Sequence, residues 1–319
     1  GDKLASCTTV ADGLAVLSEA QQLGNEQVGA AIVSMAQGIV DFYDRQGQTP
    51  NYLQYGIGLL DRCLRTSPGD FVVIGGRPSA GKTALAIQIA DKLSEKHRIG
   101  FFSLETSDAQ IFDRLIAQSC MVDFGAIKDR KIPEADYIRL TERQRELSNR
   151  KLDVIHASGM SVADIQAITL SKQYEIIMID YLQLLRETGR NANRTEAVSR
   201  MSMELHRLAQ THGVIALSQL GRPENKGELQ KAPTLSSLRE SGQIEQDADA
   251  VLLLYLTDPA DPHSDRRLKV AKNKEGELGT ADLNFEGRFQ RFIEYMPEEK
   301  PTKIPKFKPQ QMRIEGRAI

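Results

Sequence analysis

Six apolar runs recur along the middle of the chain, and each has the length of one buried strand. They span residues 71–76, 99–105, 152–157, 176–182, 214–220 and 250–256. Within each run the apolar residues follow one another without alternating with polar ones, a pattern typical of strands covered on both faces of a sheet. The sequence therefore predicts a central, mainly parallel sheet.

Helical patterns separate these runs. The segment "TALAIQIADKLSEK" places Leu85, Ile89 and Leu93 on one stripe. The segment "TEAVSRMSMELHRLAQTHG" repeats this spacing and is predicted to stop at Gly213. Alternation of strands and helices indicates an α/β fold with right-handed crossovers.

The two ends of the chain follow other patterns. Residues 267–274 and 281–295 alternate apolar and polar positions, which predicts antiparallel strands with a hairpin turn at Glu286 and Gly287. Residues 297–319 are rich in Pro and Lys and are predicted to form an extended tail.

The first fifty residues contain no strand-like run. Ile32, Met35, Ile39 and Phe42 recur at three- and four-residue spacing, which predicts an amphipathic helix within residues 25–46. Two interpretations fit this helix. Either it packs on its own domain, or it docks on another subunit.

Composition narrows the classes of function. The chain has 41 Lys and Arg against 43 Asp and Glu, a net charge of −2, so it lacks the basic excess of proteins that coat nucleic acid non-specifically. Cys7, Cys63 and Cys120 are scattered, which gives neither a disulfide framework nor zinc spacing and fits a reducing cytoplasm. No apolar run approaches the roughly 20 residues that a membrane span needs.

A glycine-rich turn follows the first apolar run. Residues Gly76 to Thr83 fit G-x-x-x-x-G-K-[ST], a phosphate cradle between a strand and a helix. We expect Lys82 to bridge the β- and γ-phosphates of ATP and the Thr83 hydroxyl to bind Mg²⁺. The residues expected to surround the phosphates are Ser79, Ala80, Gly81, Lys82, Thr83 and Ala84.

Polar residues end three further apolar runs. Asp180 ends "IIMID", where a carboxylate can hold Mg²⁺ through water, although an Asp there can also cap a helix. Glu105 ends "FFSLE" and can orient and deprotonate an attacking water. Gln219 ends "VIALSQ" and can sense the γ-phosphate by hydrogen bonding. Since parallel strands bring their carboxyl ends to one edge, these residues predict a site that hydrolyses ATP.

The chain resembles the C-terminal motor domain of DnaB-type replicative DNA helicases, which has a RecA-like fold. The segments that match the family are "GGRPSAGKTA", "FSLETS", "MIDYLQLL", "IALSQLGR" and "LSSLRESGQIEQDADAV", and the similarity covers about residues 52–295. The resemblance implies a homohexameric ring that hydrolyses ATP, moves 5′ to 3′ on single-stranded DNA and unwinds duplex during replication. Primase and a helicase loader are the implied protein partners.

The resemblance also assigns the long polar stretch at residues 221–243. The matching loop of the family lines the ring channel and holds the DNA backbone, which implies that Arg239, Glu240 and Gly242 contact DNA phosphates. Three more arginines belong either to a second channel loop or to a solvated surface loop, namely Arg186, Arg190 and Arg194.

One position departs from the family. Its strand reads Lys-x-Arg, with the arginine reaching the ATP of the neighbouring subunit, whereas this chain has Lys272 and Lys274. We expect both lysines to act in trans, although lysine lacks the planar fork of arginine. Without the resemblance, a surface pair on an edge strand explains them as well.

The resemblance divides the chain into a helical linker segment at residues 1–50, an ATPase domain at 51–296 and the tail at 297–319. Residues 1–24 are too short for the collar domain of the family, so we expect either that the sequence is trimmed or that the protein has lost the collar. A recombination or repair ATPase shares the cradle, but "RESGQIEQDAD" argues against it. A helicase-like scaffold or loader that does not unwind DNA remains a further alternative.

Overall fold

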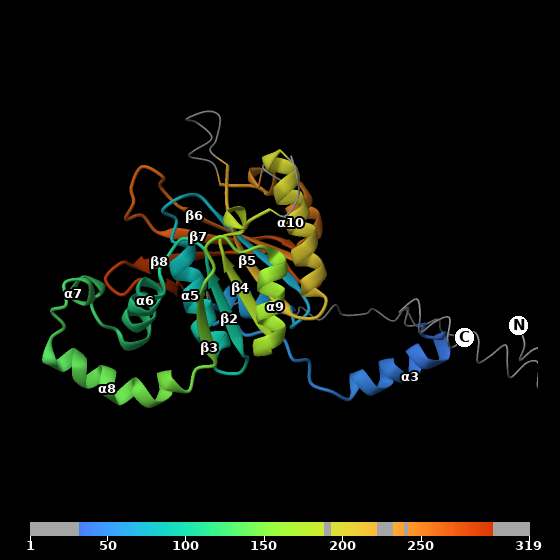
Figure 1. Ribbon diagram of the computed structural model, residues 1–319, viewed down its shortest axis with the longest axis horizontal. Helices are drawn as coiled ribbons and strands as arrows, with labels where there is room; N and C mark the ends of the chain where they lie inside the picture. Colours follow the sequence, from blue (N-terminus) through green and yellow to red (C-terminus); the bar gives the residue numbers. More distant parts are fainter. Residues whose placement is uncertain (1–31, 188–192, 222–231, 239–241, 296–319) are drawn as a thin grey trace, which may run out of the picture. The chain divides into compact units, whose positions relative to one another are not determined.

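The computed structural model describes residues 32–187, 193–221, 232–238 and 242–295 (Figure 1). Contacts divide the chain into two units between Asn51 and Tyr52, and each unit is described by itself. The second unit contains the sheet and all of the site described below.

The second unit is built on one sheet with the strand order β3-β2-β4-β5-β1-β6-β7-β8-β9. Every neighbouring pair from β3 to β6 is parallel, and the pairs from β6 to β9 are antiparallel. The predicted mainly parallel α/β sheet is therefore confirmed. The strands are β1 (Phe71–Gly76), β2 (Ile99–Ser103), β3 (Leu152–His156), β4 (Ile176–Asp180), β5 (Gly213–Gln219), β6 (Ala250–Leu256), β7 (Arg266–Asn273), β8 (Gly279–Glu286) and β9 (Arg291–Glu294).

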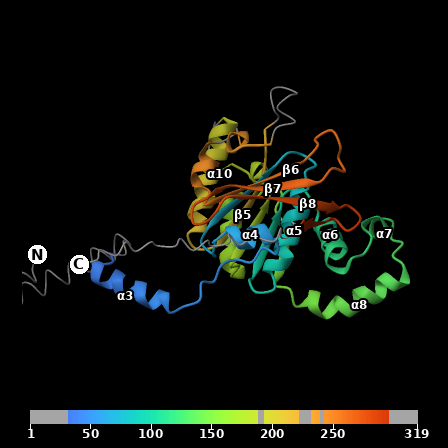
Figure 2. The ribbon, with the colours of Figure 1, turned by 180° about the vertical axis from the view of Figure 1, so that it is seen from behind.

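Helices cover both faces of the parallel part (Figures 1 and 2). One apolar core packs under α5 and α6, and the other under α9 and α10. Strand β1 contributes Val72 and Ile74 to the first core and Phe71 and Val73 to the second, so its apolar run is buried on both sides. The helices of this unit are α4 (Gly58–Cys63), α5 (Lys82–Leu93), α6 (Asp108–Cys120), α7 (Phe124–Lys128), α8 (Glu134–Ser148), α9 (Val162–Lys172), α10 (Arg194–Ala209), α12 (Gly242–Asp247) and the short 3₁₀ turns η1 (Leu182–Leu184) and η2 (Leu235–Ser237).

The predicted helix stop at Gly213 is wrong. Helix α10 ends at Ala209 with Gln210 as its C-cap, and Gly213 is the first residue of β5. Its N–H donates to the Glu175 carbonyl at 2.8 Å, and an added Cβ would lie 3.1 Å from the Ile176 side chain. The glycine therefore permits close packing of β5 on β4 instead of ending a helix.

The predicted hairpin joins β8 and β9, but its turn is longer than the expected pair. Residues 287–290 form the turn, and Gln290 has a φ of +56°. The Phe289 N–H donates to the Glu286 carbonyl at 2.9 Å and closes it. The extra length places Gln290 beside the cavity described below.

The first unit contains α3 (Met35–Gln46), which confirms the predicted helix over those residues. The Ser34 hydroxyl caps it by accepting a hydrogen bond from the Gln37 N–H. No residue of α3 is buried within the described part of its own unit, and Met35, Ile39 and Phe42 are exposed. Its apolar stripe is thus uncovered there.

Within the described ranges, no helix has the length and apolar character that crossing a membrane requires. Cys63 and Cys120 are buried free thiols, and Cys7 lies outside the described residues.

Candidate nucleotide-binding site

The cradle joins the central strand to its helix. Strand β1 ends at Gly76, α5 begins at Lys82, and the loop between them adopts left-handed backbone at Ser79 (φ 63°) and Gly81 (φ 99°). Gly81 is the N-cap of α5, so no side chain caps the first main-chain N–H groups of the helix. These N–H groups and the helix dipole favour an anion at this end of α5.

The Lys82 side chain folds back over the loop. Its ammonium donates to the carbonyls of Gly76 at 2.8 Å and Arg77 at 3.3 Å. A Cβ on Gly76 would lie 2.9 Å from the Lys82 side chain, so glycine is needed for this path. Burial lowers the pKa of Lys82, while the charges of Asp180 and Glu105 oppose that shift.

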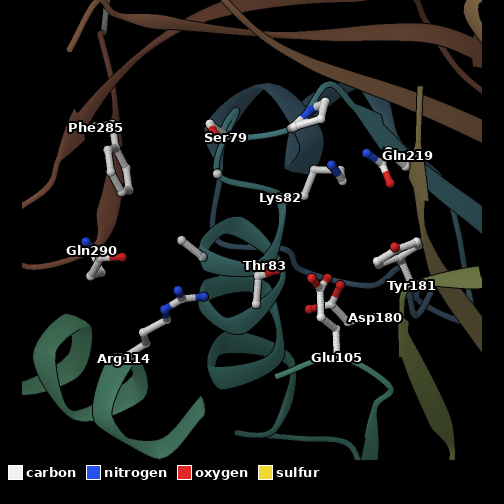
Figure 3. Close-up of a pocket in the computed structure, with 13 residues that line it drawn as sticks. Ser79, Lys82, Thr83, Glu105, Arg114, Asp180, Tyr181, Gln219, Phe285 and Gln290 are labelled. Carbon is white, nitrogen blue, oxygen red and sulfur yellow. The ribbon is translucent and has the colours of Figure 1, made fainter. Parts of the chain in front are cut away.

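A cavity of about 480 Å³ opens beside this loop (Figure 3). It brings together the cradle and the polar residues that end β4 and β5 or follow β2. Phe285 and Gln290 of the β8–β9 hairpin line the side opposite Gln219 and Tyr181. The residues that sequence analysis predicted and that line the cavity are Ser79, Gly81, Lys82, Thr83, Ala84, Glu105, Asp180 and Gln219. Ala80 of the same loop is buried and is not among the residues that line the cavity.

Asp180 is the last residue of β4 and is 3% exposed. A hydrogen bond with the Thr83 side chain stabilises its charge, but burial has the larger effect and raises the pKa of the carboxyl. Its Oδ2 atom has no hydrogen-bond partner among the described residues. An unpaired carboxylate oxygen beside a threonine hydroxyl fits Mg²⁺, which prefers oxygen ligands and binds through one or two carboxylates and phosphates.

Glu105 lies next to Asp180, two residues after the end of β2. The Leu104 N–H donates to the Asp180 main-chain oxygen at 2.8 Å, and the Ser103 hydroxyl donates to the Thr106 carbonyl at 2.6 Å. These bonds close the turn that holds Glu105. The side chain itself is exposed to the cavity, where a carboxylate can contact water.

Gln219 ends β5, and a residue that sequence analysis missed holds its main chain. The Gln183 Oε1 accepts from the Gln219 N–H at 3.1 Å, and the Gln183 Nε2 donates to the Gln219 carbonyl at 3.1 Å. Nε2 also donates to the Ser218 hydroxyl at 2.9 Å. A polar residue within the otherwise apolar "YLQLL" was the available signal.

Arg114 is the second residue that sequence analysis missed. It projects from α6 into the cavity, and its Nε is buried without a hydrogen-bond partner among the described residues. Burial lowers the pKa of Arg114, and the negative charge of Asp180 opposes this. A cation between the buried Ile111 and Leu115 of α6 was the available signal.

The two lysines predicted to act in trans lie outside this cavity. Lys272 pairs with Val251 near the start of β6, and the Lys274 N–H donates to the Asp249 carbonyl at 3.0 Å. Lys274 is therefore at the amino edge of the parallel sheet, the length of β1 or about 20 Å from the cradle. Lys272 is level with Val73, the third residue of β1. The structure therefore does not bring them to the cavity of their own chain.

Of the three residues predicted to contact DNA, the structure describes one. Arg239 and Glu240 lie outside the described residues, and Gly242 is the exposed first residue of α12. Among the other loop arginines, Arg186 pairs with Asp164 at 3.2 Å, and Arg190 lies outside the described residues. The side chain of Arg194, the first residue of α10, is not described either.

The fold and the cavity define a class. A parallel sheet whose central strand leads into a phosphate cradle, with acidic residues at the ends of neighbouring strands, is a P-loop nucleotide-binding domain. A KaiC-like protein from Pyrococcus horikoshii shares the fold, with a TM-score of 0.51 at 13% identity.

Within that class, the chain belongs to the DnaB-like helicase C terminal domain family, which it matches over residues 53–294. It is 32% identical over 282 residues to the replicative DNA helicase DnaC of Bacillus subtilis, covering 84% of this chain and 62% of that protein. It is 34% identical over 249 residues to the replicative DNA helicase DnaB of Geobacillus stearothermophilus, covering 74% and 55%. The chain spans between about half and two thirds of the length of these relatives.

Two solved structures agree with this membership. One is an isolated ATPase domain, which superposes with a TM-score of 0.76 at 31% identity, covering 83% of this chain and 100% of that one. A DnaB-like replicative helicase, described with its interactions with primase, gives a TM-score of 0.74 at 31% identity, covering 86% and 70%. The similarity to both includes sequence as well as fold.

The burial of Asp180 predicts how one substitution changes stability. Since the pKa of its carboxyl is raised by folding, the charged form destabilises the folded protein, and this cost appears as pH rises above about 4. Without Mg²⁺ or nucleotide, Asp180→Asn is expected to unfold at a higher urea concentration than the wild type at pH 7. The difference should narrow as pH falls through the raised pKa of the folded state and be lost below about 4, where the wild-type carboxyl is protonated in both the folded and the unfolded protein. An Asp180→Asn protein that is less stable than the wild type at pH 7 would contradict this assignment.

Proposed function

We propose that this chain is the motor of a replicative DNA helicase, an ATPase that assembles as a homohexameric ring and moves 5′ to 3′ along single-stranded DNA. The observation that supports this most is the convergence of Lys82, Thr83, Glu105, Asp180 and Gln219 on one cavity in a chain of the DnaB-like family. Family membership does not favour the alternative of a recombination ATPase.

Each cavity residue has a role that its surroundings support. Lys82 exchanges its contacts with loop carbonyls for the β- and γ-phosphates of ATP. The Thr83 hydroxyl and, through water, the Asp180 carboxylate would hold Mg²⁺, which would neutralise phosphate charge. The Arg114 side chain lines the same cavity and adds positive charge there.

Hydrolysis needs a group that activates water. Glu105 is an exposed carboxylate in the cavity, and hydrogen bonds to main-chain carbonyls hold the turn that carries it. It is therefore placed to orient and deprotonate the attacking water. Gln219 senses the γ-phosphate. Gln183 holds the main chain at Gln219. A movement of Gln219 is therefore transmitted along the chain to residue 221 and to the polar stretch that we assign to DNA binding.

The Glu105 role predicts separate effects on binding and chemistry. Glu105→Gln should lower kcat for ATP hydrolysis by at least about 100-fold, the scale of general-base catalysis, and leave nucleotide affinity within about threefold. Steady-state hydrolysis and fluorescent-nucleotide titration measure the two quantities. The matched control is Glu134→Gln at the start of α8, which should hydrolyse ATP at the wild-type rate. Wild-type turnover by Glu105→Gln would exclude this residue as the base.

Lys272 and Lys274 are proposed to complete the site of the neighbouring subunit, because both lie outside the cavity of their own chain and Lys274 is at the opposite edge of the sheet from its own cradle. Lysine provides a point charge without the bidentate geometry of arginine. The ring therefore has an ATP site at each subunit interface. DNA in the central channel is contacted by Arg239, Glu240 and Gly242 of each subunit.

Subunit mixing tests this arrangement. Lys82→Ala rings are expected to be inactive, and Lys274→Ala rings are expected to keep only a small, measurable rate of ATP hydrolysis. Random mixed rings should regain about a quarter of wild-type hydrolysis, because a Lys274→Ala subunit has an intact cradle and a Lys82→Ala neighbour supplies the lysine. Hydrolysis is measured after subunit exchange, with the unmixed proteins as controls. No recovery on mixing would contradict action in trans.

We further propose that α3 docks on the neighbouring subunit. Its apolar stripe has no cover in its own unit, and a separate apolar groove of about 420 Å³ lies between α6 and α8. Exposed Phe112 and Tyr137 line this groove and would pack against the stripe. Primase and a loader are proposed as further partners, since one structural relative is described with primase.

Docking by α3 predicts weaker assembly when its stripe is charged. Ile39→Glu should raise the protein concentration needed for ring assembly by about tenfold or more, because docking would bury the carboxylate in an apolar groove. Sedimentation with ATP present measures the assembled fraction. Gln37→Glu, on the other side of α3, is the control and should assemble as the wild type does. Normal assembly of Ile39→Glu would remove the docking proposal.

A further inference from the structure

Residues 245–249, which comprise the end of α12 and the connection to β6 (the α12–β6 turn), hold both lysines at the end of β7. The Lys272 ammonium donates to the carbonyls of Glu245 at 2.5 Å and Gln246 at 3.1 Å. These carbonyls belong to the C-terminal end of α12, where a cation is favoured by the helix dipole. Lys272 is thereby fixed to the end of that helix.

Asp249 holds the second lysine. Its Oδ1 atom accepts from the Lys274 ammonium at 2.6 Å, and its carbonyl accepts from the Lys274 N–H at 3.0 Å. Its Oδ2 atom accepts from the Phe71 N–H at 2.8 Å, and its own N–H donates to the Phe71 carbonyl at 2.8 Å. One carboxylate, 16% exposed, thus fixes Lys274 to the first residue of β1.

The α12–β6 turn is itself firmly attached. The Asp247 carboxylate accepts from the Ser202 hydroxyl of α10 at 2.7 Å and from the Gln243 amide at 2.7 Å. Ile244 and Ser202 are buried. Helix α12, which begins at Gly242, and the lysines at its other end therefore form one packed unit.

The ion pair with Asp249 leaves the Lys274 ammonium able to bind a phosphate as well. An ammonium group has three N–H donors, of which Asp249 takes one, so two remain for a phosphate of another subunit. The lysine stem has several rotatable bonds, and the ion pair restricts the positions that its charge can occupy. Lys274 is 44% exposed, so its head is accessible from outside the subunit.

Resting on the proposed trans role of Lys274, we infer that Asp249 is a positioning residue for that lysine. It presents the ammonium to the ATP of the neighbouring subunit and ties it to the packed unit that starts at Gly242, the predicted DNA contact. In this way one subunit links its DNA contact to the ATP site of the next. Asp249 itself touches neither ATP nor DNA.

A double-mutant cycle on DNA-stimulated hydrolysis tests this role. Asp249→Asn keeps an acceptor for the Phe71 N–H and removes the charge that holds Lys274. It should lower kcat by about three- to tenfold, the scale of a charged hydrogen bond, with KM for ATP within about twofold. In a Lys274→Met background, Asp249→Asn should have no further effect on kcat, because the residue it positions is gone.

The matched control is Asp282→Asn, which removes a carboxylate paired with Arg267 at 2.6 Å on the same antiparallel part of the sheet. This variant should hydrolyse ATP as the wild type does. Thermal unfolding of each variant reports any general loss of structure, and the affinity for single-stranded DNA should stay within about twofold of the wild type.

Three results would overturn the inference. An equal loss of kcat from Asp249→Asn in both backgrounds would mean that the residue acts through the fold alone. A gain in kcat would mean that the ion pair withholds Lys274 instead of presenting it. Wild-type turnover by Lys274→Met would remove the trans role as well, so failure of the proposed function is distinguishable from failure of the positioning role.

Discussion

The carboxyl ends of parallel strands must lie along one edge of their sheet, and the site depends on this constraint. With β2, β4, β5 and β1 as neighbours, the residues at those ends meet although more than a hundred positions separate Glu105 from Gln219. Apolar cores on both faces hold the strands in register. The same burial leaves the Asp180 carboxylate poorly solvated, so structural stability and the chemistry of the site oppose each other at that residue.

In the proposed ring, the two edges of the sheet serve the ATP sites of different subunits. The cradle lies at the carboxyl edge, and Lys274 lies at the amino edge, where Asp249 connects it to the start of β1. Because a folded strand has a fixed length, no local movement brings Lys274 to the cradle of its own chain. The proposed trans role of Lys274 therefore requires a second copy of the chain, which is the physical basis of the proposed ring.

Sequence patterns predicted some elements well and others poorly. The six apolar runs became β1 to β6, and five of these strands are buried on both faces as their composition predicts. The run at 152–157 became β3, which is only partly buried because it lies at the edge of the sheet. Residues 108–148 gave no separate predictions, and α8 there buries only Asp136, so it has little apolar stripe to detect. Gly213 was misassigned because glycine suits both the end of a helix and close strand packing, and only the neighbouring Ile176 distinguishes them.

The sequence by itself determined the class of fold, the cradle and the polar residues that end the strands, because each depends on neighbours within a few positions. Tertiary structure alone decided that Arg114 faces the cavity, that Gln183 holds β5 and that Asp249 holds Lys274. Those contacts join elements that are distant along the chain, and strand order and helix packing set them. Local periodicity has no information about such pairs until the sheet is assembled.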